Sequence, residues 1–428
     1  MAFEKKDIIK LTDHLFRENS GKMVAVLSRL FGLQHLDQIM DVVQDTFETA
    51  LQKWKYSGVP ENPSAWLMQV AKNRAINVFK KESRMWLTEP QLMAAQLEGG
   101  LTVPEAIDRH FLGNEPEDSQ LRLLLTCCHP DFSDKNQIIL TLNILSGFGV
   151  SEIANAMLMK DEAVKKALSR SKARLKEKKS ILETPLLPKD EKRVHTVHTI
   201  LYLIYNEGYK TTRASEVLNH DLCYEAMRLT KILLKKGVAL KHQSEALLAL
   251  MFFNLARFAA RLGTEGEMIN LAKQDRSQWN TTFIQEGRYY LNNSIKAKNI
   301  SRYHIEAIIA SLHCSAKSFE ETDWQSISRL YEQLETVSPS PMVRLLKLVT
   351  KSYTDDAGQI LPEIELLKKG GQMNSHYLLF AAEADLLKRV GKIRAALEAY
   401  ERAEQLTSSH PDKVFLQAKV AKCKSLLY

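Results

Sequence analysis

Apolar residues recur every three or four positions along most of the chain, and this spacing constrains the fold more than any other feature. It is typical of amphipathic α-helices, which bury one face and expose the other. Only 17 glycines and 12 prolines interrupt the 428 residues. The sequence therefore predicts an all-α fold, with short interruptions near its start at Ser20-Gly21, Gly32 and residues 57–63.

Clusters of glycine and proline divide the chain into four parts. A first helical block covers about residues 5–85. Residues 86–117 contain several helix breakers and acids, and we expect them to be an interdomain linker. A second helical block covers residues 118–180. After a segment with two prolines, helical spacing resumes and covers residues 190–428.

The last part contains weak internal repetition, with small residues and an aromatic on the spacing of tetratricopeptide repeats. Small residues let two helices approach, and an aromatic fills the gap to the next pair. A generic helical hairpin is the alternative explanation. The residues on this spacing are Ala384, Gly391, Ala396, Tyr400 and Ala403.

Composition indicates an ordinary globular protein, with 45% apolar and 26% charged residues. No uncharged run of about 18 apolar residues is present, so we expect no membrane span. The N-terminal residues are charged and lack an apolar signal core. Five cysteines without regular spacing fit a reducing compartment. A cytoplasmic protein that does not bind membranes is therefore expected.

Residues 36–54 predict a helix with an acidic face and an apolar stripe. Four acids recur at three- to four-residue spacing and so share one side: Asp37, Asp41, Asp45 and Glu48. The stripe for packing consists of Ile39, Val43, Phe47, Ala50 and Trp54. For an isolated helix, a solvated acidic face over a core is the simpler explanation.

Residues 64–84 predict a second helix, for which Ser64 is the expected N-cap. Hydrogen-bonding amides, cations and a stacking tryptophan, as nucleic-acid recognition requires, lie opposite its apolar arc. Arg74 falls outside this polar face, and we expect it to pair with an acid of the preceding helix such as Asp45. The polar face consists of Trp66, Gln69, Asn73, Asn77, Lys80 and Arg84.

Residues 136–176 carry the pattern of a helix-turn-helix. After a glycine turn, Ser151 is expected to cap a short helix and Asp161 a long one. Residues 160–179 contain nine basic residues against three acidic ones. A helix of this kind enters a major groove, with cations on phosphates and polar side chains on base edges. Its expected inner stripe is Val164, Leu168, Ser171 and Leu175.

Taken together, these segments resemble the extracytoplasmic-function sigma factors of bacterial RNA polymerase. The runs DVVQDTF (41–47), PSAWL (63–67) and AKNRA (71–75) resemble their conserved domain 2. SEIA (151–154) and RSKAR (170–174) look like their domain 4.

The later part resembles the long tetratricopeptide-like extension of one subgroup of these factors. The segments that carry this likeness are LYLIYNEGY (201–209), QDR (274–276) and TDW (322–324). The resemblance covers nearly the whole chain in the same order. It implies a transcription initiation factor that is not an enzyme and uses no cofactor or metal.

The resemblance also implies partners and site residues. In the family, domain 2 binds the clamp helices of the largest polymerase subunit and opens the −10 element, while domain 4 reads the −35 element and meets the beta flap. The implied polymerase-binding residues are Asp41, Gln44, Asp45 and Glu48. The implied −10 DNA-binding residues are Lys72, Asn73, Asn77, Lys80, Lys81 and Arg84. The implied −35 DNA-binding residues are Lys165, Lys166, Ser169, Arg170 and Lys172.

The extension is expected to regulate the factor, either by contacting polymerase and the sigma domains or by binding a protein or small ligand. A conventional helix-turn-helix regulator with a tetratricopeptide-like sensor is the alternative. The acidic helix followed by an amide-rich helix favours the sigma factor, because an ordinary regulator needs neither.

Three further groups of residues suggest site chemistry. We expect buried thiols rather than a zinc site at Cys127-Cys128-His129, because adjacent cysteines cannot easily ligate one ion. We expect His195 and His198 to serve packing or solvent contact. Residues 206–209 (NEGY) and Gln274-Asp275-Arg276, with Trp279, could form a Glu–Arg or Asp–Arg pair that either locks helix ends or lines a ligand pocket. The sequence contains no phosphate loop or hydrolase motif.

Overall fold

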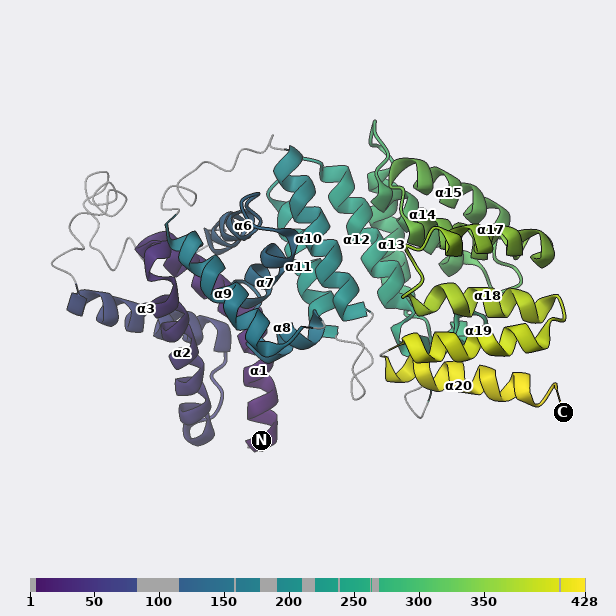
Figure 1. Cartoon of the computed structure of the whole chain (residues 1–428). Helices are drawn as coiled ribbons and strands as arrows, with labels where there is room; N and C mark the ends of the chain where they lie inside the picture. Colours follow the sequence, from purple (N-terminus) through teal and green to yellow (C-terminus); the bar gives the residue numbers. More distant parts are fainter. Residues whose placement is uncertain are drawn as a thin grey trace. The chain divides into compact units, whose positions relative to one another are not determined.

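The computed structural model confirms the all-α prediction, because every regular element in the described residues is helical (Figure 1). The chain divides into two compact units, of which the first contains residues 1–207 and 224–239 and the second residues 208–223 and 240–428. The structure describes residues 5–82, 115–157, 159–177, 191–209, 220–237, 239–261, 263, 269–407 and 409–427.

The first unit contains the helices of both predicted sigma domains and most of the two helices that follow them. Helices α10 and α11 straddle the boundary, and their adjoining ends belong to the second unit. The elements are α1 (Lys5–Phe31), η1 (Leu33–His35), α2 (Leu36–Ser57), α3 (Pro63–Glu82), α6 (Glu115–Cys127), α7 (Asp134–Ile144), α8 (Val150–Ala156), α9 (Asp161–Lys176), α10 (Glu191–Tyr209) and α11 (His220–Lys235).

Helices α1, α2 and α3 enclose the first core. The predicted apolar stripe of α2 is buried at all five positions, including Trp54, which is 2% exposed. The predicted break at Ser20-Gly21 is wrong, because α1 continues through both residues. Gly21 instead allows a close approach: a Cβ there would lie 1.9 Å from the carbonyl oxygen of Leu145.

Helices α6 to α9 enclose the second core, in which the predicted inner stripe of α9 is buried throughout. The two predicted caps are wrong. Ser151 lies inside α8, and its hydroxyl donates to Asp161 Oδ2 at 2.5 Å. Asp161 is the first residue of α9 after the N-cap position Lys160. The serine and the aspartate therefore join the two helices of the helix-turn-helix instead of capping them separately.

The first helices after residue 190 pack against this second core. The Arg193 guanidinium donates to the carbonyl oxygen of Leu125 in the last turn of α6, with its Nη2 at 2.7 Å. Glu225 is 8% exposed and accepts from the Ser146 hydroxyl at 3.1 Å and from Nε and Nη2 of Arg228, each at 2.8 Å. Arg228 also reaches Gln120 of α6 at 3.1 Å.

The second unit is a series of helices that begins with an almost fully buried one. Helix α12 buries twelve of its sixteen residues, so its neighbours surround it. The elements are α12 (Lys241–Ala256), η3 (Phe258–Arg261), η4 (Leu271–Lys273), η5 (Arg276–Gln278), α13 (Thr281–Ser294), α14 (Arg302–Ser315), α15 (Trp324–Val337), α16 (Pro341–Lys351), α17 (Ala357–Lys369), α18 (Tyr377–Arg389), α19 (Ile393–Leu406) and α20 (His410–Lys424).

Helices α18 and α19 form a hairpin at the residues with tetratricopeptide spacing. Ala384 and Ala396 are completely buried where the two helices meet. Gly391 turns the chain between the helices with a φ of 78°, a conformation that favours glycine. The hydroxyl of Tyr400, which is 1% exposed, donates to Asp385 of α18.

Arginine side chains close the C-terminal ends of helices in the second unit. Arg276 Nη1 donates to the carbonyl oxygens of His313 at 2.6 Å and Ala316 at 2.7 Å, at the end of α14. Arg389 Nη2 donates to the carbonyl oxygen of Ser352, at the end of α16, at 2.6 Å. These carbonyls have no partner within their own helix, and a cation also favours the negative end of the helix dipole.

The segment 274–276 therefore locks a helix end, which was one of the two expected roles. Asp275 does not pair with Arg276 but accepts from the backbone nitrogen and hydroxyl of Ser277, at 2.9 and 2.6 Å. Arg276 also reaches the hydroxyl of Thr322 at 3.3 Å. Residues 274–276 and 322–324 thus meet in the fold.

Candidate functional site

The acidic face of α2 is exposed above its buried stripe. The four residues expected to bind polymerase are all solvent-accessible, and Gln44 Nε2 donates to Glu48 Oε1 at 3.3 Å. Three of the four are acidic and share one face, so they form a negatively charged surface that suits a basic partner. These residues are Asp41, Gln44, Asp45 and Glu48.

Arg74 fixes α3 against α2. Its Nη1 lies 3.0 Å from Asp45 Oδ2, and its Nη2 donates to the Thr49 hydroxyl at 2.6 Å. The predicted pairing of Arg74 with Asp45 is therefore confirmed. Arg74 therefore joins the acidic surface of α2 to the amide-rich helix α3, although it was predicted to contact neither polymerase nor DNA.

The exposed face of α3 presents amides, as predicted. Asn73 and Asn77 are exposed, and Gln69 Nε2 donates to Asn73 Oδ1 at 3.3 Å. Trp66 is half-buried, with its ring centroid 5.4 Å from that of Trp54.

Lys72 departs from the predicted set. It is only 7% exposed and does not share the open surface of Asn73 and Asn77, because its position on α3 turns it toward the protein. The Lys80 and Lys81 side chains and the whole of Arg84 lie outside the described residues. The predicted Ser64 cap is also wrong, since Asn62 Oδ1 accepts from the backbone nitrogen of Ala65 at 3.0 Å.

On α9, four of the five predicted −35 residues are exposed. Lys165 pairs with Glu162 at 3.0 Å, and this hydrogen bond raises the pKa of Lys165. The three cations among these residues are therefore accessible to a phosphate. The four residues are Lys165, Lys166, Ser169 and Arg170.

Lys172 turns away from the other four and toward α2. Its side chain is 18% exposed, and its Nζ lies 4.0 Å from Asp37 Oδ1 and 3.2 Å from Met40 Sδ. Burial lowers the pKa of Lys172, against the attraction of Asp37. In this arrangement Lys172 contacts α2 and is not open to DNA.

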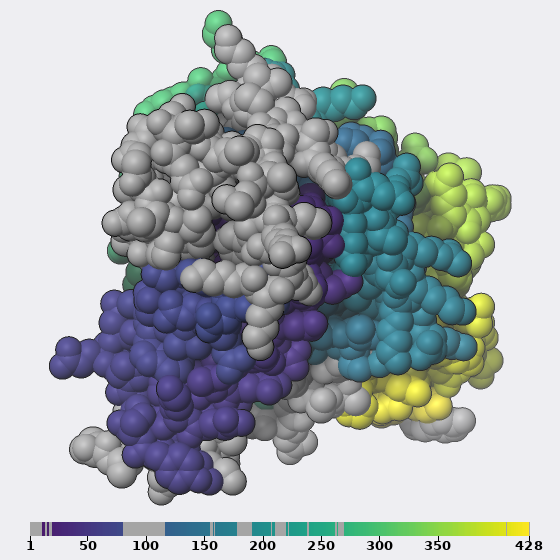
Figure 2. All heavy atoms as spheres, turned by 90° about the vertical axis from the view of Figure 1, so that its left-hand side faces the viewer, coloured from purple at the N-terminus to yellow at the C-terminus, as the bar shows by residue number. Residues whose placement is uncertain are grey.

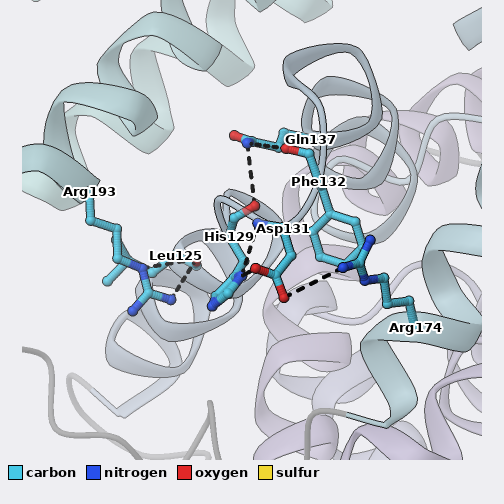
Figure 3. A network of polar contacts seen from close by, with 7 residues as sticks. All are labelled: Leu125, His129, Asp131, Phe132, Gln137, Arg174 and Arg193. Atoms are coloured by element: carbon cyan, nitrogen blue, oxygen red, sulfur yellow. Dashed lines mark hydrogen bonds and ion pairs between the residues drawn. The ribbon is translucent and has the colours of Figure 1, made fainter.

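A polar network supports the far end of α9 (Figure 3). Arg174 lies 3.8 Å from Asp131 and over the Phe132 ring, in the turn between α6 and α7. Gln137 Nε2 donates to the carbonyl oxygens of His129 at 3.3 Å and Phe132 at 2.8 Å. Residues of α7 and α9 thus hold the turn between α6 and α7. Arg193 of α10 binds the last helical turn of α6, just before it.

The predicted burial of the thiols in this region is confirmed. Cys127 and Cys128 are both completely buried, and burial raises the pKa of Cys128 to about 12. His129 Nδ1 accepts from the backbone nitrogen of Asp131 at 3.2 Å. Among the described residues, no group of three or more potential ligands is arranged to hold a metal ion.

Sequence reasoning missed the contact between the two helix groups. Lys176 Nζ lies 2.5 Å from Asp37 Oδ2, which joins α9 to the first turn of α2. In Figure 2 the violet and blue surface of residues before 83 borders the blue-green surface of later residues. The one sequence signal was Gly21, a glycine inside a strongly periodic helix, which is unfavourable unless another backbone comes close.

Comparison with known proteins bears on the first helix group. Residues 15–85, which contain most of α1 and all of α2 and α3, match the family model of sigma-70 region 2. The chain therefore carries a sigma-70 region 2 domain, which supports membership of the sigma-70 family. The acidic face of α2 and the amide-rich face of α3 therefore both lie within the sigma-70 region 2 match.

The rest of the chain matches less informative relatives. Residues 193–295 match a family of unknown function, DUF6596. An uncharacterized protein of Rhizobium meliloti is 31% identical over 401 residues, which are 94% of this chain and 93% of the relative. The chain and this relative are thus alike across both compact units.

No solved structure matches this chain. Within the described residues, no helix is both long enough and apolar enough to span a membrane.

Proposed function

We propose that the chain is an extracytoplasmic-function sigma factor that binds core RNA polymerase, reads the −35 element with α9 and opens the −10 element with α3. The observation that carries the proposal is the combination of two exposed surfaces: the acids of α2 beside the amides of α3, and the cations of α9. A regulator that only binds duplex DNA needs the second surface but not the first.

The face of α2 supports polymerase docking. Asp41, Asp45 and Glu48 are exposed on one side of a helix whose other side is buried. Long-range attraction of this face to basic residues of polymerase speeds assembly and weakens with salt. We therefore expect the affinity for core polymerase to fall as ionic strength rises.

The face of α3 suits single-stranded DNA. Strand opening costs a few kcal/mol per unstacked step, so an open strand must gain contacts that the duplex does not offer. The exposed amides of Asn73 and Asn77 can bind base edges that pairing normally occupies. No hydrolysis is required for this step, because binding energy and polymerase supply the opening.

The exposed cations of α9 suit duplex DNA. Lys165, Lys166 and Arg170 project from one side of the helix, whose inner stripe is buried. In the proposed complex they neutralise phosphates in and beside the major groove, while Ser169 contacts a base edge or the backbone.

The second unit is proposed to regulate the factor as a tetratricopeptide-like domain. Its hairpin of α18 and α19, with small buried residues on the expected spacing, supports this assignment. The domain is proposed to act either by contacting polymerase and the sigma helices or by binding a protein or small ligand.

Copurification with core polymerase and run-off transcription on genomic promoters test the proposal. Charge reversal at both Asp41 and Asp45 is expected to abolish holoenzyme assembly, and loss of Lys165 and Arg170 to reduce initiation at least tenfold, about 1.4 kcal/mol. Lys165→Arg with Arg170→Lys is the matched control, because it preserves the charges. Full initiation by both altered proteins would refute the proposal, and tight operator binding without polymerase would favour a conventional regulator.

A further inference from the structure

Three arginines of the second unit lie around the C-terminal end of α14, where α12, α13 and α14 pack against one another (Figure 1). Arg276 donates to two carbonyl oxygens at this end, and Arg288 Nη2 of α13 donates to the Ser315 hydroxyl oxygen at 3.4 Å. The guanidinium carbons of Arg257 and Arg276 lie 5.3 and 4.8 Å from the centroid of the Trp279 ring. The three guanidinium groups therefore form one cluster, the arginine cluster.

The thiol of Cys314 lies within the field of all three arginines. Burial raises the pKa of Cys314 to about 11, while Arg257, Arg276 and Arg288 each act in the opposite direction. The three positive charges therefore act together next to the last turn of α14.

The arginine cluster has no acidic partner at ion-pair distance. The ion pairs that this unit forms among the described residues involve other cations. Burial lowers the pKa of Arg276, and the neighbouring charge of Arg257 lowers it further; Cys314 and the exposed acids Glu320 and Glu321 oppose this shift more weakly. The dipole of α14 offsets only about half of one charge. A bound anion would therefore stabilise the cluster.

Arg257 is held in one orientation with its outer edge unused. Its Nε donates to Gln274 Oε1 at 3.3 Å, and Gln274 is itself 8% exposed and fixed by a bond to the carbonyl oxygen of Ile269 at 3.0 Å. Among the described residues, nothing accepts from Nη1 or Nη2 of Arg257. Two N–H groups on one planar edge suit two oxygens of a carboxylate or a phosphate.

A buried donor without a partner belongs to the same cluster. Trp279 is 4% exposed and packs against the guanidinium groups of Arg257 and Arg276. Its Nε1, like the buried Nδ1 of His313, has no hydrogen-bond partner among the described residues. Buried polar groups are nearly always hydrogen-bonded, so orphaned nitrogens beside unpaired guanidinium groups are typical of a site that binds a further polar group.

We propose that Arg257 and Arg288, with Trp279, form a binding site in the second unit for a small dianion, either a phosphoryl group or a dicarboxylate. Two guanidinium groups without acidic partners match two negative charges, whereas one carboxylate would leave a positive charge unpaired. Arg257 is half-buried and Arg288 is exposed, so an anion can reach both from solvent. Arg276 and Gln274 are positioning residues, because they fix the end of α14 and the Arg257 guanidinium. The regulatory consequence of binding rests on the proposed function, whereas binding itself does not.

Calorimetric titration of the full chain with inorganic phosphate and, separately, with succinate tests the site, with the ionic strength held constant by sodium chloride. One or both anions should bind saturably with one site per chain. Arg257→Gln and Arg288→Gln should each weaken binding by at least about tenfold, since each removes charge-assisted hydrogen bonds. Arg394→Gln removes the same charge from an exposed position of α19 and should leave binding unchanged.

Chemical protection provides a measurement that depends on no variant. Phenylglyoxal modifies accessible guanidinium groups, and mass spectrometry of peptides identifies the modified positions. The bound anion should slow the modification of Arg257 and Arg288 but not that of Arg394. The same anion should change promoter-specific transcription by the unaltered holoenzyme and leave transcription by the Arg257→Gln holoenzyme unchanged.

The proposal would be overturned if neither anion bound saturably, or if Arg257→Gln and Arg288→Gln left the affinity intact. Equal modification of Arg257 and Arg394 at a saturating anion concentration would contradict it as well. Failure of the proposed function looks different: the anion would still bind and protect Arg257, but no form of the chain would initiate transcription with core polymerase.

Discussion

Arg74 and Asp45 connect the helix proposed to open DNA with the helix proposed to dock polymerase, with 3.0 Å between Nη1 and Oδ2. The same guanidinium holds Thr49 at 2.6 Å, one turn further along α2. Two donors on one planar group fix an angle as well as a distance. This side chain therefore helps to set the orientation of α3 relative to the acidic face, together with the core contact of Trp54 and Trp66.

Arg74→Ala is expected to loosen α3 on α2. The pair is partly exposed, so the loss of unfolding free energy should be modest, about 1 kcal/mol. Open-complex formation should fall more than stability does, because Asn73 and Asn77 lose their fixed placement. Thermal unfolding and promoter opening measure the two effects. Arg74→Lys keeps the charge but not the double contact, and full activity of this variant would contradict the positioning role.

Arg276→Ala is expected to destabilise the second unit by about 2–3 kcal/mol. Two carbonyl oxygens at the end of α14 lose their charged donor, and Thr322 loses its contact. Denaturant unfolding followed by the fluorescence of Trp279, on which Arg276 packs, measures this change. Asp275→Asn is the comparison, since it disturbs only the local turn and should cost less than half as much.

Acid should weaken the second unit through His313. Burial, aided by Arg257 and Arg276, lowers the pKa of His313 to about 3. An unfolded histidine titrates near 6.5, so the unfolded chain binds more protons between about pH 6.5 and 3. Stability is therefore complete above pH 6.5 and falls as pH decreases, by up to about 1.4 kcal/mol per pH unit. Unfolding free energies from pH 7.5 to 4.5 should show this slope, and His313→Gln should reduce it.

The thiols should resist modification in the folded chain. Burial raises the pKa of Cys128 to about 12 and of Cys314 to about 11, and it raises the pKa of Cys127 well above its usual value. Thiolates are the reactive form, so reaction with a thiol reagent at pH 8 should track unfolding. Rapid reaction of these cysteines under native conditions would mean that the cores open frequently.

Truncation should distinguish packing from regulation. Residues 191–207 and 224–239 belong to the first compact unit, and Arg193 and Arg228 bind α6. A chain ending at residue 182 loses these contacts and should melt at a lower temperature than one ending at 239. Promoter-specific transcription by the longer form then tests the second unit alone. Unchanged activity and regulation in that form would argue against a regulatory role for the second unit.

Periodicity and local chemistry determined much of this protein from sequence alone. The apolar stripes of α2 and α9 are buried at the predicted positions, because an amphipathic helix packs its apolar face against the core. The Arg74 pairing followed from its place outside the polar arc of its own helix. The exposed acids, amides and cations followed from the same helical geometry.

Only the tertiary structure decided the rest. The role of Gly21 depends on Leu145, 124 positions later in the sequence, and no local rule relates the two. Ser151 and Asp161 have ordinary cap chemistry but bond to each other, because the turn between α8 and α9 brings them within 2.5 Å. Lys72 and Lys172 carry the same charge as their exposed neighbours, and each is covered by the packing around it. The spacing of residues along a helix determines which side chains share a face. Which of those side chains are buried depends on segments that are distant in the sequence and pack against that face.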